Sequence, residues 1–277
     1  MDEDRLNLFE TVWPRSRARI TLADRLGWRW GDVSAPFLKS DRGRLLAHVG
    51  VLELPVRIGG QDSLVASIHA VCTRPGFRSR GLATELMAQA LAGLDLRGIP
   101  VQLSTDIPAF YEPMGFEELH LSRFRLDVAA GPPHKPMRPL SDRRADDVRL
   151  VRAALESRMP VSEIWSVRDS GWLLPINEVL THGGFRRFGW CEPAETLVVW
   201  ELVGDTLRLL DLVFARVPDL SVILATMPGG WTSVESCVHP DRFEVPFEAV
   251  DANNPETFMV RGQQRQETSA VSPLWMT

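Results

Sequence analysis

The chain has 277 residues and a mass of 31.1 kDa, more than most single hydrophobic cores accommodate, which predicts two domains of moderate size. Hydrophobic residues make up 44% and charged residues 24% of the chain, values that exclude a disordered or fibrous protein. The net charge of -5 and the pI near 5.7 argue against a nucleic-acid-binding protein, because such proteins present a basic surface to phosphate groups.

Further features of the composition predict a cytoplasmic protein. The first ten residues, MDEDRLNLFE, are acidic and lack the apolar segment of a secretory signal. No run approaches the roughly 20 apolar residues that a membrane span needs. The three cysteines, Cys72, Cys191 and Cys237, are scattered and show no metal-ligand spacing. We therefore expect no disulfide framework and no metal site.

The first predicted elements are two strands over residues 44–58 and 63–73, which are rich in apolar and β-branched residues. The glycines at 59 and 60 between them predict an antiparallel pair. A loop, RPGFRSRG, leads into a predicted amphipathic helix that begins at or just after Gly81 and repeats apolar residues every four positions. A strand over 98–105 follows, so the order of elements predicts a βαβ crossover with one parallel strand pair.

A proline-rich segment over residues 131–144 predicts a linker, because such a run continues neither a helix nor a central strand. It divides the chain into an N-terminal domain over 1–130 and a C-terminal domain over 145–277. A strand over 124–130 is expected to be the last of the first domain.

The second half has its own predicted elements. Residues 144–157 predict a helix with two aspartates near its positive end. Residues 196–214 predict a hairpin that turns at Gly204-Asp205. A short helix over 218–227 and a final strand over 257–262 follow. This α/β order is compatible with a degenerate copy of the first domain.

The most informative segment is VCTRPGFRSRGLATEL, residues 71–86, a strand that leads through a small and basic turn into a helix. The free N–H groups and the dipole at such a helix start favour binding of a phosphate or pyrophosphate. Gly81 lets the backbone approach an anion closely, and Arg74, Arg78 and Arg80 add positive charge. The alternative is a surface loop with solvated arginines. Neither a Walker P-loop nor a dinucleotide-binding GxGxxG is present, which argues against ATP and NAD.

Two motifs resemble those of the GNAT N-acetyltransferases. The segment RSRGLA, residues 78–83, resembles the R/Q-x-x-G-x-G/A signature of that family, and residues 71–83 resemble its common strand-plus-loop form. The segment FYEPMGF, residues 110–116, resembles the second family motif, and a helix and a strand separate the two motifs as in the family. The resemblance covers roughly residues 35–128.

The resemblance implies a GNAT fold, an α/β fold with a mixed, splayed and mostly antiparallel sheet flanked by helices. It also implies acetyl-CoA as co-substrate, with the strand backbone binding the pantetheine arm and the loop and helix start binding the pyrophosphate. The sheet is expected to open just after this strand, where the thioester meets the acceptor amine. The residues that match these positions are Val71, Cys72, Thr73, Arg78, Ser79, Arg80, Gly81, Leu82, Ala83 and Thr84.

Tyr111, the single tyrosine of the chain, matches the family tyrosine that protonates the departing CoA thiolate. A phenol with an ordinary pKa near ~10 stays protonated at neutral pH and can donate to sulfur. Direct attack of an amine on the thioester needs no covalent enzyme intermediate. Cys72 is therefore expected to be a small buried strand residue and not a nucleophile.

The base that deprotonates the amine has several candidates. His69 shares a strand face with Val71 and is either a base in the cleft or a packed core histidine. Glu53 is either a base or a solvated edge carboxylate. The two-part layout also resembles the Eis-type branch of the family, in which the C-terminal carboxylate acts in the active site, so the carboxylate of Thr277 is a third candidate.

We expect an acetyl-CoA-dependent N-acetyltransferase acting on a small-molecule amine, with neither nucleic acid nor membrane as a partner. A catalytically silent CoA-binding sensor and a protein or peptide N-acetyltransferase are the alternatives. A homodimer is expected only as the commonest symmetric assembly. Tryptophans of the second half are candidates for an acceptor pocket between the domains, namely Trp165, Trp172, Trp190, Trp200 and Trp231.

Overall fold

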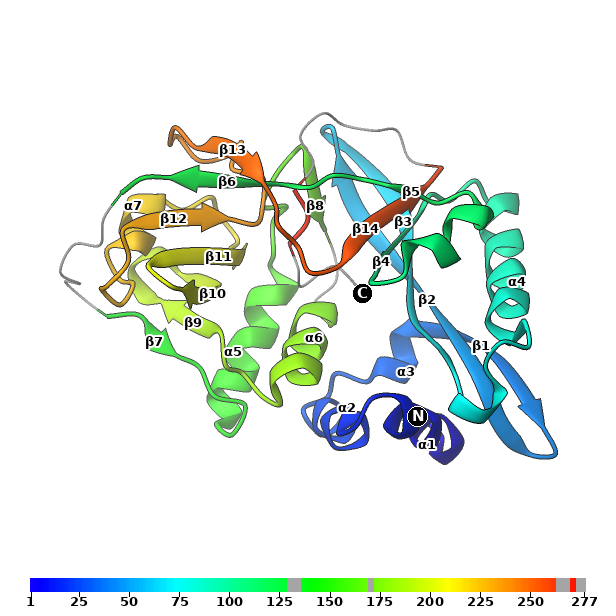
Figure 1. The fold of residues 1–277 in the computed structure, drawn as a ribbon. Coiled ribbons are helices and arrows are strands. Elements are labelled where there is room, and N and C mark those ends of the chain that lie inside the picture. Colours follow the sequence, from blue (N-terminus) through cyan, green and yellow to red (C-terminus); the bar gives the residue numbers. More distant parts are fainter. Residues whose placement is uncertain (129–135, 169–171, 263–269, 273–277) are drawn as a thin grey trace.

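The computed structural model describes residues 1–128, 136–168, 172–262 and 270–272. These residues form two mixed β-sheets that lie side by side with helices packed around them (Figure 1). In this part of the chain no helix is long and apolar enough to cross a membrane. The α/β class expected from the sequence is confirmed.

The first sheet has the strand order β1-β2-β3-β4-β14-β5, and β8 also pairs with β2. Its strands are β1 (Ser34–Asp41), β2 (Arg44–Ile58), β3 (Gln61–Thr73), β4 (Val101–Thr105), β5 (Glu117–Glu118), β8 (Trp165–Val167) and β14 (Thr257–Arg261). The predicted antiparallel pair is β2 and β3. The predicted crossover is also confirmed, because β3 and β4 are parallel and helix α4 (Leu82–Leu96) connects them.

The second sheet has the strand order β13-β6-β12-β11-β10-β9-β7. Its strands are β6 (Ser122–Leu126), β7 (Arg138–Pro139), β9 (Phe188–Cys191), β10 (Thr196–Val203), β11 (Thr206–Val213), β12 (Ser233–Ser236) and β13 (Glu248–Asp251). The predicted hairpin is β10 and β11. Strands β11 and β12 are parallel, and helix α7 (Leu220–Leu224) lies between them in the chain.

The two sheets exchange strands across the linker expected from the sequence. Strand β6, expected to end the first domain, instead pairs with β12 and β13 of the second sheet. Strand β14, from near the end of the chain, lies between β4 and β5 of the first sheet. Its Phe258 and Val260 pack into one core cluster and its Met259 into another, so both faces of β14 are buried. An apolar strand buried on both faces suits a central place in a sheet, and β14 has such a place between β4 and β5.

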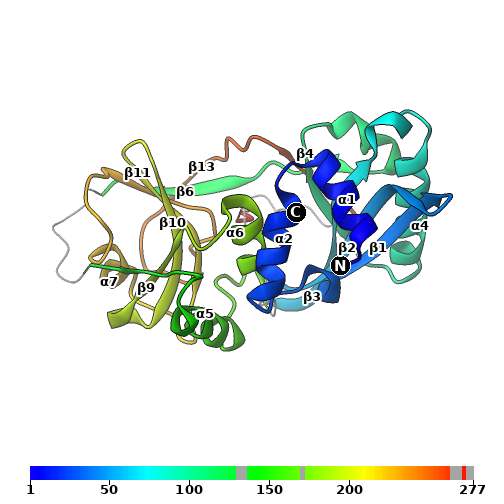
Figure 2. The ribbon, with the colours of Figure 1, turned by 90° about the horizontal axis from the view of Figure 1, so that it is seen from below.

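Helices of both halves meet between the sheets. The N-terminal segment forms α1 (Glu3–Val12), α2 (Ser16–Arg25) and α3 (Trp30–Val33), which were not expected from the sequence, and neither was α6 (Leu173–His182). Helix α5 (Ala145–Glu156) was predicted. Helix α2 packs against α6, as seen from below in Figure 2.

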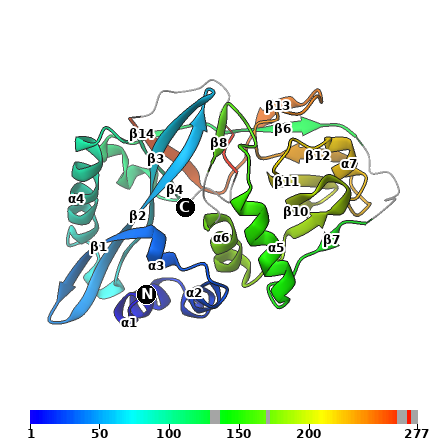
Figure 3. The same cartoon turned by 180° about the vertical axis from the view of Figure 1, so that it is seen from behind.

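The largest core cluster crosses from one half of the chain to the other. It contains Leu52 and Leu54 of β2 together with Leu173 and Ile176 of α6, all completely buried. Figure 3 shows α6 between the two sheets from behind. The two halves are therefore joined by a continuous apolar core.

Candidate functional site

The loop between β3 and α4 has the backbone of an anion-binding turn. Ser79 and Gly81 both adopt left-handed conformations, with φ of 59° and 73°. Gly81 is the N-cap of α4, and the first intrahelical bond of this helix runs from the N–H of Glu85 to the carbonyl of Gly81, at 2.9 Å. The N–H groups of the three residues before Glu85 therefore precede the helical ladder and are available to a ligand.

Two arginines of this loop, Arg78 and Arg80, are exposed and held by the loop itself. Arg78 donates to the carbonyl of Thr73 at 3.3 Å, and the Arg80 guanidinium lies over the Phe77 ring at 4.9 Å from its centroid. Within the described part of the chain neither arginine forms an ion pair with a carboxylate. Their positive charge thus adds to that of the helix start.

A cavity of about 600 Å³ brings the predicted loop and Tyr111 together. All ten residues matched to the acetyl-CoA site, over 71–73 and 78–84, line this cavity, which we call the loop cavity. Val12, Phe77, Asp106, Ile107, Phe110 and Tyr111 complete its lining. Residues far apart in the sequence therefore surround one space next to an anion-binding turn.

The sheet opens beside this cavity. The pairing of β3 with β4 covers only Ala66 and Ser67 on β3, whereas the other edge of β4 pairs with β14 along its whole length. The end of β3 still pairs with β2 on its other side, through Cys72 and Thr73. The edge of β3 that faces away from β2 is therefore open to backbone hydrogen bonds with an extended ligand.

Tyr111 is 6% exposed and packs edge-on against Phe110 and Phe116, with ring centroids 4.8 and 5.9 Å away. Burial raises the pKa of the Tyr111 phenol to about 12, although a hydrogen bond with Thr105 opposes this shift. The phenol is therefore protonated throughout the neutral range and is a proton donor, not a base.

A β-bulge lies at the end of β3 where the sheet opens. Ala70 has a φ of 49°, and the register of β2 and β3 shifts between the His48 and Gly50 positions. The Nδ1 of His48 lies 2.9 Å from the Ala70 carbonyl, which can only accept, so Nδ1 carries the proton. Burial lowers the pKa of His48 to about 4. A neutral His48 thus fixes the bulge, a role for which no local sequence pattern offered a signal.

His69 is 3% exposed and lies next to this bulge. Its Nε2 lies 2.8 Å from the hydroxyl of Ser34, and its ring packs edge-on against Trp30, with centroids 4.6 Å apart. Gly50 makes room for it, since a Cβ there would lie 2.3 Å from Nε2. Burial lowers the pKa of His69 well below its usual value, and the neighbouring His48 adds to this.

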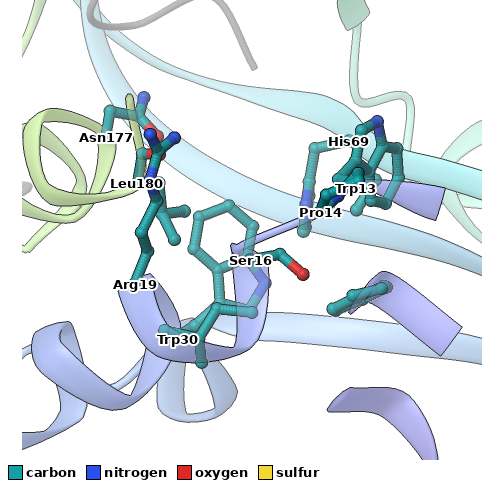
Figure 4. A pocket seen from close by; sticks show the side chains of 11 residues that line it. Trp13, Pro14, Ser16, Arg19, Trp30, His69, Asn177 and Leu180 are labelled. Atoms are coloured by element: carbon teal, nitrogen blue, oxygen red, sulfur yellow. The ribbon is translucent and has the colours of Figure 1, made fainter. Parts of the chain in front are cut away.

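His69 also lines a second cavity of about 350 Å³, which we call the aromatic cavity (Figure 4). Its other lining residues are Phe9, Trp13, Pro14, Ser16, Arg19, Ile20, Trp30, Ala70, Asn177 and Leu180. The linings of the two cavities meet at consecutive residues of the chain, Val12 and Trp13 in one segment and Ala70 and Val71 in another. The bulge therefore stands between them.

The tryptophans of this cavity are not those expected from the sequence. Trp13 and Trp30 come from the N-terminal helical segment. None of the five tryptophans proposed from the second half lines either cavity. The segment that contains Trp13 and Trp30 has few regularly spaced apolar residues, so the sequence did not predict that they line a cavity. Their aromatic side chains were the one available signal.

The other candidate residues lie elsewhere. Glu53 is on the exposed side of β2 and forms an ion pair with Arg97, whose Nη2 lies 2.9 Å from Oε2, and this hydrogen bond lowers the pKa of Glu53. Glu53 lines neither cavity. Thr277 lies outside the described residues. Cys72 is buried, and burial raises the pKa of its thiol to about 12, so it is no ready nucleophile.

Among the described residues, no group of three or more histidines, cysteines or carboxylates is arranged to hold a metal ion.

Comparison with known proteins finds a family model that matches part of the chain. A model described as an acetyltransferase (GNAT) domain matches residues 4–119. No curated protein matches the sequence. Among solved structures, a protein from Enterococcus faecalis, described as a probable N-acyltransferase, has a TM-score of 0.55 at 11% identity, covering 94% of this chain and 69% of its own.

Two further structures are similar over most of the chain. A GCN5-related N-acetyltransferase from Kribbella flavida has a TM-score of 0.53 at 17% identity, covering 93% of this chain and 67% of its own. Eis1 from Mycobacterium abscessus has a TM-score of 0.48 at 15% identity, covering 88% and 71%. The Enterococcus and Kribbella structures share the fold of both halves of this chain.

Proposed function

We propose that this chain, whose residues 4–119 match a model described as an acetyltransferase (GNAT) domain, is an acetyltransferase that transfers an acetyl group from acetyl-CoA directly to a primary amine of a small molecule. The observation that carries the proposal is the loop cavity, which joins an anion-binding turn, an open strand edge and a buried phenol in one space. These are the parts that a thioester with a diphosphate handle requires.

The residues present fit acetyl-CoA. The turn at Ser79 and Gly81 leaves the N–H groups at the start of α4 free to bind the pyrophosphate of acetyl-CoA. The exposed arginines add positive charge there. A Cβ on Gly81 would meet nothing within 4 Å, so the space in front of the turn is open to a ligand. The free edge of β3 over 71–73 pairs with the amide groups of the pantetheine arm.

In the reaction the amine nitrogen forms a bond to the thioester carbonyl carbon, and the C–S bond breaks with its electron pair on sulfur. Tyr111 donates its proton to the leaving thiolate, and the amine loses one proton to a base or water. Holding both reactants in register across the bulge supplies part of the rate acceleration. Cys72 takes no part.

His69 is the proposed acceptor of the amine proton. Among the described residues that line the aromatic cavity, it is the one side chain with an imidazole ring, whose neutral form has a nitrogen that can accept a proton. Its lowered pKa keeps it neutral, so it accepts a proton only to pass it on to water. Strong basicity is not required, because burial of the amine lowers the pKa of a bound ammonium and favours the neutral amine.

The test is a thiol-release assay with acetyl-CoA and a panel of primary amines, combined with calorimetry of CoA binding. Acetyl-dependent thiol release that needs an amine supports the proposal. CoA binding without thiol release for any amine would instead identify a silent CoA-binding module.

A protein or peptide acceptor is less compatible with the structure. Helix α6 contributes Asn177 and Leu180 to a wall of the aromatic cavity, which leaves less room for a polypeptide than an open cleft would. Acetylation of peptides at higher kcat/KM than of any small amine would overturn the small-molecule assignment.

A further inference from the structure

The aromatic cavity defines a class of acceptor, an inference that rests on the proposed acetyltransferase function. Its walls are mainly apolar and aromatic, with Phe9, Trp13, Ile20, Trp30 and Leu180 as the large side chains. Trp13 is 41% exposed although it is a large apolar residue at the cavity mouth. Surfaces of this kind bind ligands that bury an aromatic or branched apolar body.

The charge on the lining of the aromatic cavity is positive. Arg19 is its single charged lining residue among those described, and the lining contains no carboxylate. The Nη1 of Arg19 donates to the Leu180 carbonyl of α6 at 2.5 Å, which holds the guanidinium at the wall, as its position in Figure 4 illustrates. A ligand with several ammonium groups would bring like charges together in an apolar space without any compensating anion.

The size of the cavity is also selective. An apolar protein cavity of roughly 150 Å³ holds a benzene molecule. At about 350 Å³ the aromatic cavity can enclose one bicyclic ring system with a short side chain. It cannot enclose a polyamino sugar of several rings.

The aromatic cavity is placed so that a bound amine can reach the loop cavity. It adjoins the loop cavity at the bulge of Ala70, so an apolar body seated against Trp13 and Trp30 can extend its amine past the bulge. Helix α6 provides the opposite wall through Asn177 and Leu180. The second half of the chain thus completes the acceptor site.

We propose that the acceptor is a primary monoamine carried on an aromatic or similarly compact apolar body, which binds between α1, α2, β3 and α6, and that Arg19 excludes polyamines and aminoglycosides. Arg19 acts by charge and Trp13 by contact with the apolar body.

The experiment compares kcat/KM for 2-phenylethylamine and tryptamine with that for spermidine and kanamycin in the full chain. We expect the arylalkylamines to exceed both polycations at least about tenfold, since like charges repel one another in an apolar site. Calorimetry of 2-phenylethylamine with CoA-saturated protein should show binding that spermidine does not.

Two variant pairs test the residues. Arg19→Glu should raise the ratio of spermidine to 2-phenylethylamine kcat/KM about tenfold or more, whereas Arg25→Glu, the same charge change on an exposed position of α2, should leave it within about twofold. Trp13→Ala should raise the KM for 2-phenylethylamine about tenfold, whereas Leu38→Ala, at 43% exposure outside both cavities, should not.

A higher kcat/KM for spermidine or kanamycin than for the arylalkylamines would overturn this inference and leave the acetyltransferase function standing. Equal effects of the two arginine variants, or of the Trp13 and Leu38 variants, would overturn the assigned roles of the residues. Failure of the protein to bind CoA would overturn the proposed function and this inference with it.

Discussion

Tyr111 lines the loop cavity and packs against two phenylalanine rings, and its raised pKa keeps the phenol protonated. Tyr111→Phe removes only the hydroxyl, so the packing with Phe110 and Phe116 is retained. We expect kcat to fall about 100-fold, the lower range for loss of a general acid, with the KM for acetyl-CoA nearly unchanged. Steady-state kinetics of thiol release measures both. An unchanged kcat would remove Tyr111 from the mechanism.

His48 makes stability depend on pH. Its folded pKa, about 4, lies below the ordinary value of 6.5, so the unfolded chain binds more protons between these values. The contribution of His48 to the free energy of unfolding is fully present above about pH 6.5. It is lost as the pH drops toward 4, by up to about 3 kcal/mol. His69 acts in the same direction.

Urea unfolding between pH 7.5 and 4.5 measures this slope. His48→Gln should make the slope shallower, and because the readout is the slope, a constant loss from altered packing does not affect it. His120→Gln is the control, since the side chain of His120 is 91% exposed. The same slope in the His48 variant and the wild type would contradict the assignment.

At the scale of the element, the turn before α4 depends on the conformation of Gly81. Gly81→Ala places a Cβ in open space but at a φ of 73°, which costs about 1–2 kcal/mol for a residue other than glycine. We expect CoA affinity to fall roughly tenfold through displacement of the helix-start N–H groups, as measured by calorimetry.

The matched control lies in the same helix. Gly93 is an interior glycine of α4 with an ordinary φ, and a Cβ added there would meet no atom within 4 Å. Gly93→Ala should therefore keep CoA affinity and stabilise the fold slightly. Equal loss of CoA affinity in both variants would show that the turn has no special role.

The elements with strong local patterns were predictable from the sequence. The four-residue repeat from Leu82 to Leu94 indicated α4, and the glycines at 59 and 60 indicated the β2–β3 turn. Helices α1 and α2 have only two buried side chains each and were missed. They form because they pack onto β2, β3 and α6, a tertiary contribution that no local periodicity reveals.

At the scale of the whole molecule, the exchange of strands makes the halves dependent on each other. A fragment of residues 1–128 would lack β14, leaving β4 unpaired on one side and Met259 missing from the core of the first sheet. It would also leave the apolar residues of β2 that pack on α6 exposed. We expect this fragment to be insoluble or unfolded, whereas the full chain unfolds in one cooperative transition.

Circular dichroism and urea unfolding of the fragment and the full chain measure this directly. A fragment with native-like spectra and a sharp transition would show that the first sheet folds without β14. The expected domain border at residues 131–144 would then also be a folding border.

Local signals in the sequence were enough to predict the β2–β3 pair and the basic turn before α4, because turn conformation and periodicity depend on residues close in the chain. Tertiary packing settled which sheet each strand joined and which helices surround the aromatic cavity. Every strand has the same backbone donors and acceptors, so hydrogen bonding alone does not select its partner. The hydrophobic effect is not directional either. The partners of β6, β14 and α6 are therefore determined by the packing of surfaces that are distant in the sequence. The proposed acceptor site belongs to this second group, since its walls come from residues 9–30, 69–70 and 177–180.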